Sequence, residues 1–181
     1  MSSLVLTTEV SLGELAIAFL QESVGNWHSQ RRYYTLKTDE VQEVESFITV
    51  SFLPRNTPEL QHLAMLHQLE DADILMGGSR VTWESNYTKE DRKPLKGSTT
   101  FGISETLMYR DRGFATIKPI TAEYTLPPDS PQTLRLRTEY KGSVFEEELK
   151  LIGRKYRTRQ TIISRAGEEQ TIGQYLEKRV G

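Results

Sequence analysis

The sequence contains no cysteine, and this one absence excludes several kinds of chemistry together. Disulfide bonds, thiolate metal sites and cysteine nucleophiles all need a thiol. A protein without one also cannot hold a ligand through a thioether of its own. The absence fits a reducing compartment.

An excess of charge of one sign is missing as well. Lysine and arginine total 23, aspartate and glutamate total 25, and the formal net charge is −2. Nucleic-acid-binding domains usually show a strong basic excess, and the largest local excess here, over 153–159, is too short to supply one. We therefore expect no nucleic-acid partner.

Long apolar runs are also lacking. No stretch approaches the roughly 20 residues that span a bilayer as a helix, and the N-terminus shows no basic segment followed by an apolar one. We therefore expect no membrane span and no signal peptide.

The 181 residues are enough for a sizeable core, and we expect 1–181 to form a single domain.

Two helices can be predicted from local signals. In the first, over 11–25, Ser11 and Glu14 have the spacing of a capping box, in which each side chain accepts a hydrogen bond from the other residue's backbone N–H. A shorter helix is predicted over 57–69, where Pro58 occupies the first helical position.

Most of the remaining sequence is typical of strands. The segments are short, rich in β-branched and aromatic residues, and separated by turns of glycine, proline or charged residues. Their regular spacing predicts a mostly-β fold, an up-and-down antiparallel barrel with an N-terminal helix and one further short helix. The predicted strands are 27–37, 43–53, 79–88, 98–104, 107–110, 113–118, 121–126, 133–141, 143–152, 156–165 and 171–180.

Side-chain alternation predicts which residues face the barrel interior. Tyr140 shares a face with neighbouring leucines, and Trp83 shares one with a valine and a tyrosine. In the first strand, Ser29 and Arg31 follow Trp27 on the same face. The inner wall is therefore expected to be aromatic and partly charged.

Glu147 stands out among these inward residues. It shares a face with Phe145 and two leucines, whereas Glu146 and Glu148 alternate outward. A carboxylate inside a barrel is costly unless a cation or hydrogen bonds meet it. A salt bridge or a place at the barrel rim explains Glu147 without any function, just as core packing explains the two tryptophans.

The cations that follow Glu147 on the next strand are Arg157 and Arg159. A three-residue loop at 153–155 would place both on the inner face, with Leu149 opposite Arg159. A two-residue turn would face them outward. The pattern leaves both registers open.

Other site patterns fail. His62 and His67 diverge around the second helix and have no evident third ligand, so we expect no metal site. The segment 76–80 lacks the lysine and the spacing of a phosphate loop, and the three histidines do not suggest a Ser–His–Asp triad. On its residues alone, the protein is a small barrel with a charged, aromatic-lined cavity, by default a ligand carrier.

Five segments stand out when they are taken in order: SVGNWHSQRRYY, SRVTWES, LRLRTEY, FEEELKLIGRKYRTRQ and QYLEKRV. This order, from about 10 to 180, resembles the S-type phycobiliprotein lyases, the bilin-attaching lyases of cyanobacteria and their plastid relatives. The G-N-W that opens the first strand is also similar to the start of the wider lipocalin and fatty-acid-binding superfamily. There the tryptophan packs across the closed end of the barrel, and we expect the same of Trp27.

The resemblance implies a lipocalin-like barrel that binds an open-chain tetrapyrrole, phycocyanobilin or a relative, without a covalent bond. It implies delivery of this bilin to a cysteine of an apo-phycobiliprotein subunit, with a thioether formed at the ethylidene group of ring A. No tightly bound cofactor is implied, because the bilin is the substrate. The client subunit would be of the phycocyanin or allophycocyanin type.

The resemblance also assigns site residues. Glu147 and Arg157 match a family motif in which a glutamate precedes an arginine by ten residues, and both are implied as catalytic groups. Arg159 matches the second arginine of that motif, and Trp83 matches a cavity tryptophan. The resemblance therefore favours the three-residue loop. The expected bilin-binding residues are Trp83, Arg159, Tyr140, Arg31 and Ser29.

Bilin chemistry agrees with charges inside the barrel. Two propionates suit guanidinium partners, protonated pyrrole nitrogens suit a carboxylate, and aromatic walls limit twisting of the chromophore. Glu147 is therefore expected to pair with the pyrrole nitrogens. Arg157 and Arg159 are expected to hold a propionate or to orient Glu147, while Trp83 packs on a ring.

Several points stay open. The stretch ELKLIGRKY replaces a more aromatic, proline-containing one in the family, so the choice of bilin and of target is undetermined. The sequence does not determine whether the chain acts alone, as a homodimer or with a second lyase subunit. The compartment would be the cyanobacterial cytoplasm or the plastid stroma. The alternative is a plain carrier of a fatty acid or another hydrophobic acid, whose carboxylate the arginines would hold.

Overall fold

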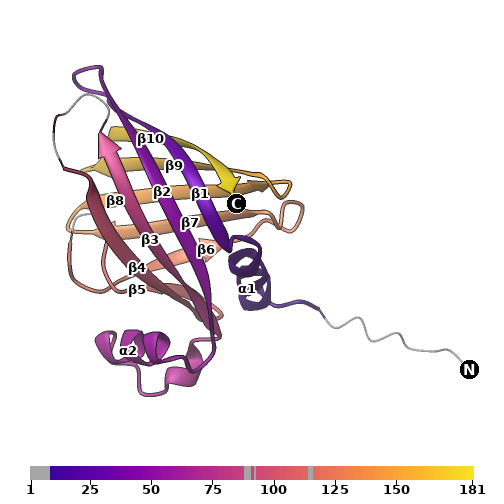
Figure 1. Ribbon diagram of the computed structural model, residues 1–181. Helices are drawn as coiled ribbons and strands as arrows, with labels where there is room; N and C mark the ends of the chain where they lie inside the picture. The colour runs from indigo at the N-terminus through magenta and orange to yellow at the C-terminus, as the bar shows by residue number, and fades with distance from the viewer. Residues whose placement is uncertain (1–8, 88–90, 92, 114–115) are drawn as a thin grey trace, which may run out of the picture.

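Ten antiparallel strands close into one barrel in the computed structural model, which describes residues 9–87, 91, 93–113 and 116–181 (Figure 1). Each strand pairs with its neighbours in sequence, and the last pairs with the first, so the barrel is up-and-down throughout. The predicted mostly-β barrel is confirmed. The strands are β1 (Gly25–Thr35), β2 (Glu40–Pro54), β3 (Gly77–Tyr87), β4 (Leu95–Ile103), β5 (Leu107–Arg110), β6 (Ile120–Thr125), β7 (Thr133–Tyr140), β8 (Ser143–Ile152), β9 (Tyr156–Arg165) and β10 (Glu168–Val180).

One predicted strand is not formed in the described part of its range. Of the segment 113–118, residues 114–115 lie outside the described residues, and the others belong to the β5–β6 connection. The backbone N–H of Gly113 donates to the carbonyl oxygen of Thr116 at 3.0 Å, which closes a turn instead of extending a strand ladder. Pro119, which has no N–H to give to a ladder, follows at once.

Helix α1 (Leu12–Glu22) begins with the predicted capping box. The N–H of Ser11 donates to Glu14 Oε2 at 3.0 Å, and the N–H of Glu14 donates to Ser11 Oγ at 3.1 Å. Ser11 Oγ also donates to Glu105 Oε1, 3.0 Å away in the β4–β5 connection. The helix is therefore tied to the barrel, and its buried face, with Phe19 and Leu20, packs into the main core.

Trp27 closes the barrel where α1 leads into β1. Its indole is fully buried, and Nε1 donates to the carbonyl oxygen of Ser23 at 2.9 Å. The guanidinium carbons of Arg157 and Arg179 lie 4.7 and 4.3 Å from the ring centroid, within the range of cation–π attraction. Trp27 thus packs across the closed end, as the resemblance implied.

The β2–β3 connection carries the second helix outside the barrel wall (Figure 1). Helix α2 (Pro58–Leu66) begins at the predicted proline, and a 3-10 helix, η1 (Ala72–Ile74), follows it. His67, just after α2, has Nε2 2.8 Å from the backbone oxygen of Arg110, which links this connection to β5. The helix packs on a small separate core formed by Leu53, Leu60, Leu63, Ala64 and Leu75.

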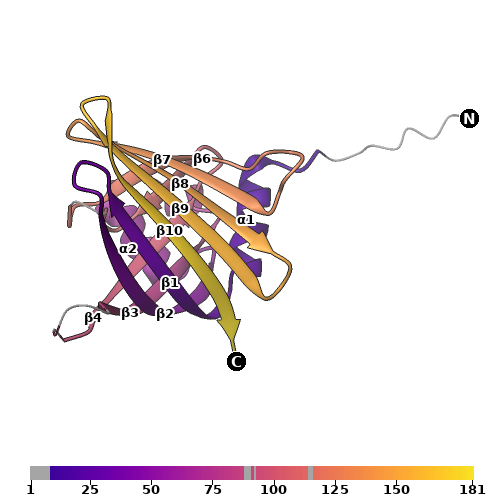
Figure 2. The ribbon, with the colours of Figure 1, turned by 90° about the horizontal axis from the view of Figure 1, so that it is seen from above.

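The two halves of the barrel interior are packed differently. Toward α1, inward side chains belong to the buried main core. Toward the opposite end, near the β1–β2, β7–β8 and β9–β10 turns, the inward-facing Tyr33, Tyr140 and Ile163 stay partly exposed. Figure 2 shows α1 at one end of the strands and the β1–β2 turn at the other. The interior is therefore closed near α1 and accessible to solvent at the turns, and we refer to these parts as the closed half and the open half.

Candidate functional site

The β8–β9 connection decides where the two arginines of β9 point. It is the three-residue loop 153–155, and it sets Leu149 opposite Arg159. Gly153 has a φ of 59°, a left-handed conformation that glycine adopts without strain. Of the two registers that the sequence left open, the one that faces Arg157 and Arg159 inward is therefore the one observed.

Glu147 lies between two arginines inside the barrel. Arg110, from β5, donates through Nη2 to Glu147 Oε1 at 2.5 Å, and Arg159 donates through Nη2 to Oε2 at 2.5 Å. The side chains of Arg110 and Glu147 are only 5% and 1% exposed, whereas that of Arg159 is 22% exposed. Each carboxylate oxygen thus accepts a hydrogen bond from a different guanidinium, and the three ionised groups together carry a net charge of +1.

Electrostatics keep this cluster ionised. Burial favours a neutral carboxyl and would raise the pKa of Glu147, but the charges and hydrogen bonds of Arg110 and Arg159 outweigh burial and hold that pKa below its ordinary value. Burial would likewise lower the pKa of Arg159, yet Glu147 raises it above its ordinary value. A negative carboxylate therefore persists inside the barrel at neutral pH.

Arg157 pairs with a different carboxylate. Its Nε donates to Glu177 Oε1, on β10, at 2.8 Å, and both side chains are almost completely buried. Burial lowers the pKa of Arg157 from its ordinary value despite this partner. Burial would raise the pKa of Glu177, but Arg157, Arg159 and Arg31 together lower it. The closed half thus contains a buried ion pair separate from the Glu147 cluster, and its Arg157 lies over the ring of Trp27.

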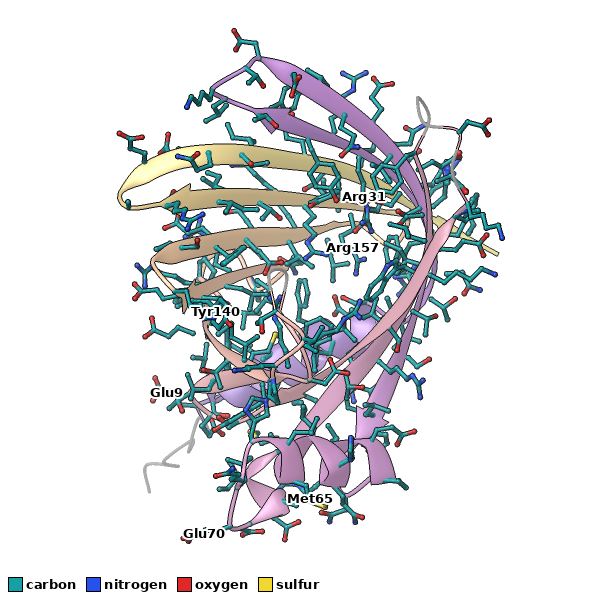
Figure 3. The ribbon with its side chains drawn as sticks, turned by 90° about the vertical axis from the view of Figure 1, so that its left-hand side faces the viewer. Glu9, Arg31, Met65, Glu70, Tyr140 and Arg157 are labelled. Carbon is teal, nitrogen blue, oxygen red and sulfur yellow. The ribbon has the colours of Figure 1, made fainter. Side chains whose placement is uncertain are left out.

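Ser29 and Arg31 face the interior beside this pair. In the β1–β10 register, Ser29 lies opposite Glu177 and Arg31 opposite Tyr175. Arg31 Nε donates to Ser29 Oγ at 3.1 Å, and the guanidinium carbon of Arg31 lies 5.0 Å from the Tyr175 ring centroid. The Arg159 guanidinium carbon lies 5.4 Å from the same centroid, so Tyr175 joins the two arginines. Figure 3 shows Arg31 and Arg157 pointing into the barrel.

Trp83 faces inward from β3 and is only partly buried. It lies opposite Ile48 on one side and Gly97 on the other. The guanidinium carbon of Arg112, from the β5–β6 connection, is 5.0 Å from the ring centroid of Trp83. A Cβ atom on Gly97 would come within 2.5 Å of the indole, so the glycine makes room for this ring.

Tyr140 lies apart from the arginine clusters, at the end of β7 in the open half. Leu136 pairs with Glu147, and Tyr140 is two inward-facing positions further along, next to the β7–β8 turn. A hydrogen bond with Thr116 lowers the pKa of Tyr140, and the Lys141 ammonium is 5.4 Å from its ring centroid. In Figure 3 Tyr140 is well separated from Arg31 and Arg157.

The predicted site residues thus fall into three groups: Glu147 with Arg159, Arg157 with Ser29 and Arg31, and the more exposed Trp83 and Tyr140.

Sequence reasoning missed Arg110, Glu177 and Tyr175. Alternation gave a signal for the last two, because they share the inner face of β10. Arg110 lies in a four-residue strand, where alternation is too short to read with assurance. Its nearness to Glu147 depends on how the barrel closes.

Metal binding and membrane spanning find no support in the part of the chain that the structure describes. None of its histidine and carboxylate side chains gather in a group of three or more that could hold a metal ion. The two α-helices within the described ranges have 11 and 9 residues and are too short to cross a membrane.

Comparison with known proteins gives consistent matches along nearly the whole chain. The model of the CpeS-like protein family matches residues 16–180. A relative from Nostoc sp., provisionally named phycocyanobilin lyase CpcS 2, is 59% identical over 164 residues, covering 91% of this chain and 90% of the relative. The phycocyanobilin lyase subunit CpcS of Picosynechococcus sp. is 30% identical over 171 residues, covering 90% of this chain and 84% of the relative.

A solved structure shares the fold. The S-type phycobiliprotein lyase CPES of Guillardia theta superposes with a TM-score of 0.76 at 22% sequence identity, covering 92% of this chain and 93% of that one. At this identity the likeness concerns the fold alone. The family match and the relatives at 30% identity and above go further, and they show that the chain belongs to the CpeS-like family of chromophore lyases.

Proposed function

We propose that this protein is a phycobiliprotein lyase. It binds an open-chain bilin, phycocyanobilin or a relative, without a covalent bond, and attaches it to a cysteine of an apo-phycobiliprotein subunit. Membership of the CpeS-like family supports this function, as do relatives named as phycocyanobilin lyases. The observation that carries it within the molecule is an ionised carboxylate, Glu147, held between arginines inside a barrel that is open at one end.

The substrate's charges match this interior. A bilin carries two propionates, and the partly exposed Arg31 and Arg159 are the proposed partners, because guanidinium binds carboxylate with two parallel hydrogen bonds. Ser29 supports Arg31 through their hydrogen bond. Trp83 and Tyr140, both inward and partly exposed, are proposed to pack against the pyrrole rings nearer the open end.

Glu147 is proposed to accept hydrogen bonds from the protonated pyrrole nitrogens and so to favour the more electrophilic form of the chromophore. The resemblance implied Arg157 as the second catalytic group, but its burial and its pairing with Glu177 favour a positioning role beneath the site. The pair is neutral as a whole, and it is proposed to form the floor on which Arg31 and Arg159 lie.

Attachment is an addition and needs no oxidant or leaving group. The client's cysteine thiolate forms the carbon–sulfur bond at the ethylidene group of ring A, and a proton is taken up by the chromophore. The nucleophile must come from the client, since this chain has no cysteine. Binding removes the bilin from water and holds ring A where one client cysteine can reach it.

The client is proposed to be a subunit of the phycocyanin or allophycocyanin type, in the cyanobacterial cytoplasm or the plastid stroma. One relative is named a lyase subunit. If the purified chain transfers bilin without any other protein, it acts as a monomer or homodimer. If it does not, a second lyase subunit is required.

The test is to add phycocyanobilin to the purified protein, record the absorption spectrum, and then add an apo-phycocyanin subunit. We expect a red-shifted complex that acid dissociates, followed by a fluorescent subunit that stays coloured after denaturation. Glu147→Gln removes the anion that Arg110 and Arg159 share, so it should lower the free energy of unfolding. In the folded variant, transfer should be slower by at least about 100-fold, the lower range for a lost acid–base group. The matched control is Glu146→Gln, one position away on the outer face. Equal transfer by the Glu147→Gln protein would remove Glu147 from the mechanism.

A carrier of fatty acids is the second candidate, because the same arginines would bind any carboxylate. Colour distinguishes the two. If phycocyanobilin causes no spectral shift, whereas a fluorescent fatty acid binds and is displaced by unlabelled oleate, the carrier function replaces the lyase function.

A further inference from the structure

The three groups of the Arg110–Glu147–Arg159 cluster differ in accessibility. Arg110 and Glu147 are almost completely buried, whereas Arg159 is 22% exposed. Arg159 also lies over the same tyrosine ring, Tyr175, as the partly exposed Arg31. Arg159 is therefore the member of the cluster that a molecule entering from the open half can reach.

Glu147 itself cannot meet a ligand in this arrangement. Its side chain is only 1% exposed, and each of its oxygens lies against a guanidinium, that of Arg110 or that of Arg159. A ligand N–H can reach the carboxylate only if one arginine moves. Of the two, Arg110 is enclosed on all sides and Arg159 is not.

We propose that Arg159 is an exchangeable partner of Glu147 and Arg110 a permanent one. A propionate of the entering bilin takes over the guanidinium of Arg159, and Glu147 Oε2 is thereby released to an N–H of the chromophore. Arg110 keeps hold of Oε1 and acts as a positioning residue. This inference rests on the proposed lyase function and specifies how its site opens.

Charge balance explains why the exchange needs a carboxylate on the ligand. Releasing Glu147 from Arg159 without another anion would take away the carboxylate that contributes most to stabilising this largely buried guanidinium, which is unfavourable. When a propionate replaces Glu147 at Arg159, every buried charge keeps a partner throughout. Arg110 is equally necessary, because without it the freed carboxylate would have no cation until the chromophore is protonated.

The test compares phycocyanobilin with its dimethyl ester, which has the same chromophore and no carboxylate. With the unaltered protein, we expect the free acid to give the red-shifted spectrum of a protonated bilin and the ester to give at least tenfold less of it. Equal red shifts from the two compounds would overturn the exchange and leave the lyase proposal standing. A red shift from neither would count against the lyase proposal itself.

Arg159→Gln supplies a rescue that a merely structural role would not produce. It frees Oε2 of Glu147 in advance and leaves the Arg110 contact intact, so the ester should now give the red shift that it lacks with the unaltered protein. The control is Arg135→Gln, which removes an exposed arginine that pairs with Glu148 on the outer face. Failure of the ester to gain a red shift in a folded Arg159→Gln protein would overturn the exchange.

Arg110→Lys tests the permanent partner. It keeps a positive charge but cannot reproduce the guanidinium contact. With the free acid, we expect the pKa of the bound chromophore to fall by at least about one unit, a tenfold weaker hold on its proton. Circular dichroism verifies folding. A folded variant with the chromophore pKa unchanged would show that Arg110 does not position Glu147.

Discussion

Both tryptophans of this protein lie beside an arginine, yet they differ in burial and in hydrogen bonding. Trp27, in the closed half, is fully buried, donates its indole N–H to a carbonyl and lies under two guanidiniums. Trp83 is partly buried, and Arg112 from a loop lies over it. The same residue type therefore serves stability in one place and is proposed to contact the ligand in the other, and burial with hydrogen bonding makes the difference.

The ion pairs follow the same division. Arg157 and Glu177, beside Trp27, are buried together and leave little access to solvent. Glu147 lies where the interior begins to open, and one of its two arginines is accessible. Buried charges are thus part of the core in one half and of a candidate binding site in the other.

Acid should have the largest effect, because it acts on both halves at once. The pKa values of Glu147 and Glu177 are held below the ordinary 4.5 in the folded state. Their contribution to stability is therefore complete above about pH 4.5 and is lost as pH falls through the lowered folded values. The free energy of unfolding, measured by urea denaturation from pH 7 to pH 3, should fall steeply below pH 4.5. A flat profile in this range would mean that neither pair contributes to stability.

Among single substitutions, Trp27→Ala should destabilise the fold most. Removing a fully buried indole is expected to lower the free energy of unfolding by about 3–5 kcal/mol. Trp83→Ala should cost roughly 1 kcal/mol, because its ring is partly exposed, and should alter the spectrum of bound phycocyanobilin. Urea denaturation and absorption spectra measure the two effects. The reverse pattern would place Trp27 in the bilin site.

Glu177→Gln tests whether the closed half needs its ion pair. The change leaves the buried Arg157 without an anion and should cost about 3 kcal/mol. Glu148→Gln is the control, since that side chain is 46% exposed and its pair with Arg135 should contribute less than about 1 kcal/mol. If Glu177→Gln left stability unchanged but abolished bilin binding, the pair would belong to the binding site.

Gly97→Ala should destabilise the fold less than Trp27→Ala does, and it should have a clear effect on the site. The added Cβ would lie 2.5 Å from Trp83 Cζ2 and 3.0 Å from Arg112 Nη2, so the indole must shift. We expect a loss of about 1–3 kcal/mol from overpacking and weaker binding of bulkier bilins. Binding constants for several bilins measure this effect. Unchanged selectivity would show that the position of Trp83 does not limit the size of the ligand.

The sequence by itself determined the local features of this protein. The capping box of Ser11 and Glu14 depends on residues three apart, and the inward position of Glu147 depends on a period of two along its strand. Both were predicted correctly because local geometry specifies them. The direction in which Arg157 and Arg159 face depended on whether the β8–β9 turn has two or three residues. Side-chain alternation does not specify the length of a turn, so the sequence pattern left both registers open.

Only the tertiary structure decided which charges meet. Arg110 is 37 residues from Glu147 in sequence and reaches it from β5, with β6 and β7 between their strands. Glu177 is 20 residues from Arg157 and lies directly opposite it across the β9–β10 hairpin, in a register that includes an irregularity between Glu169 and Thr171. Alternation can show that a side chain faces inward, but its partner depends on the closure and curvature of the whole barrel, which no short stretch of sequence encodes.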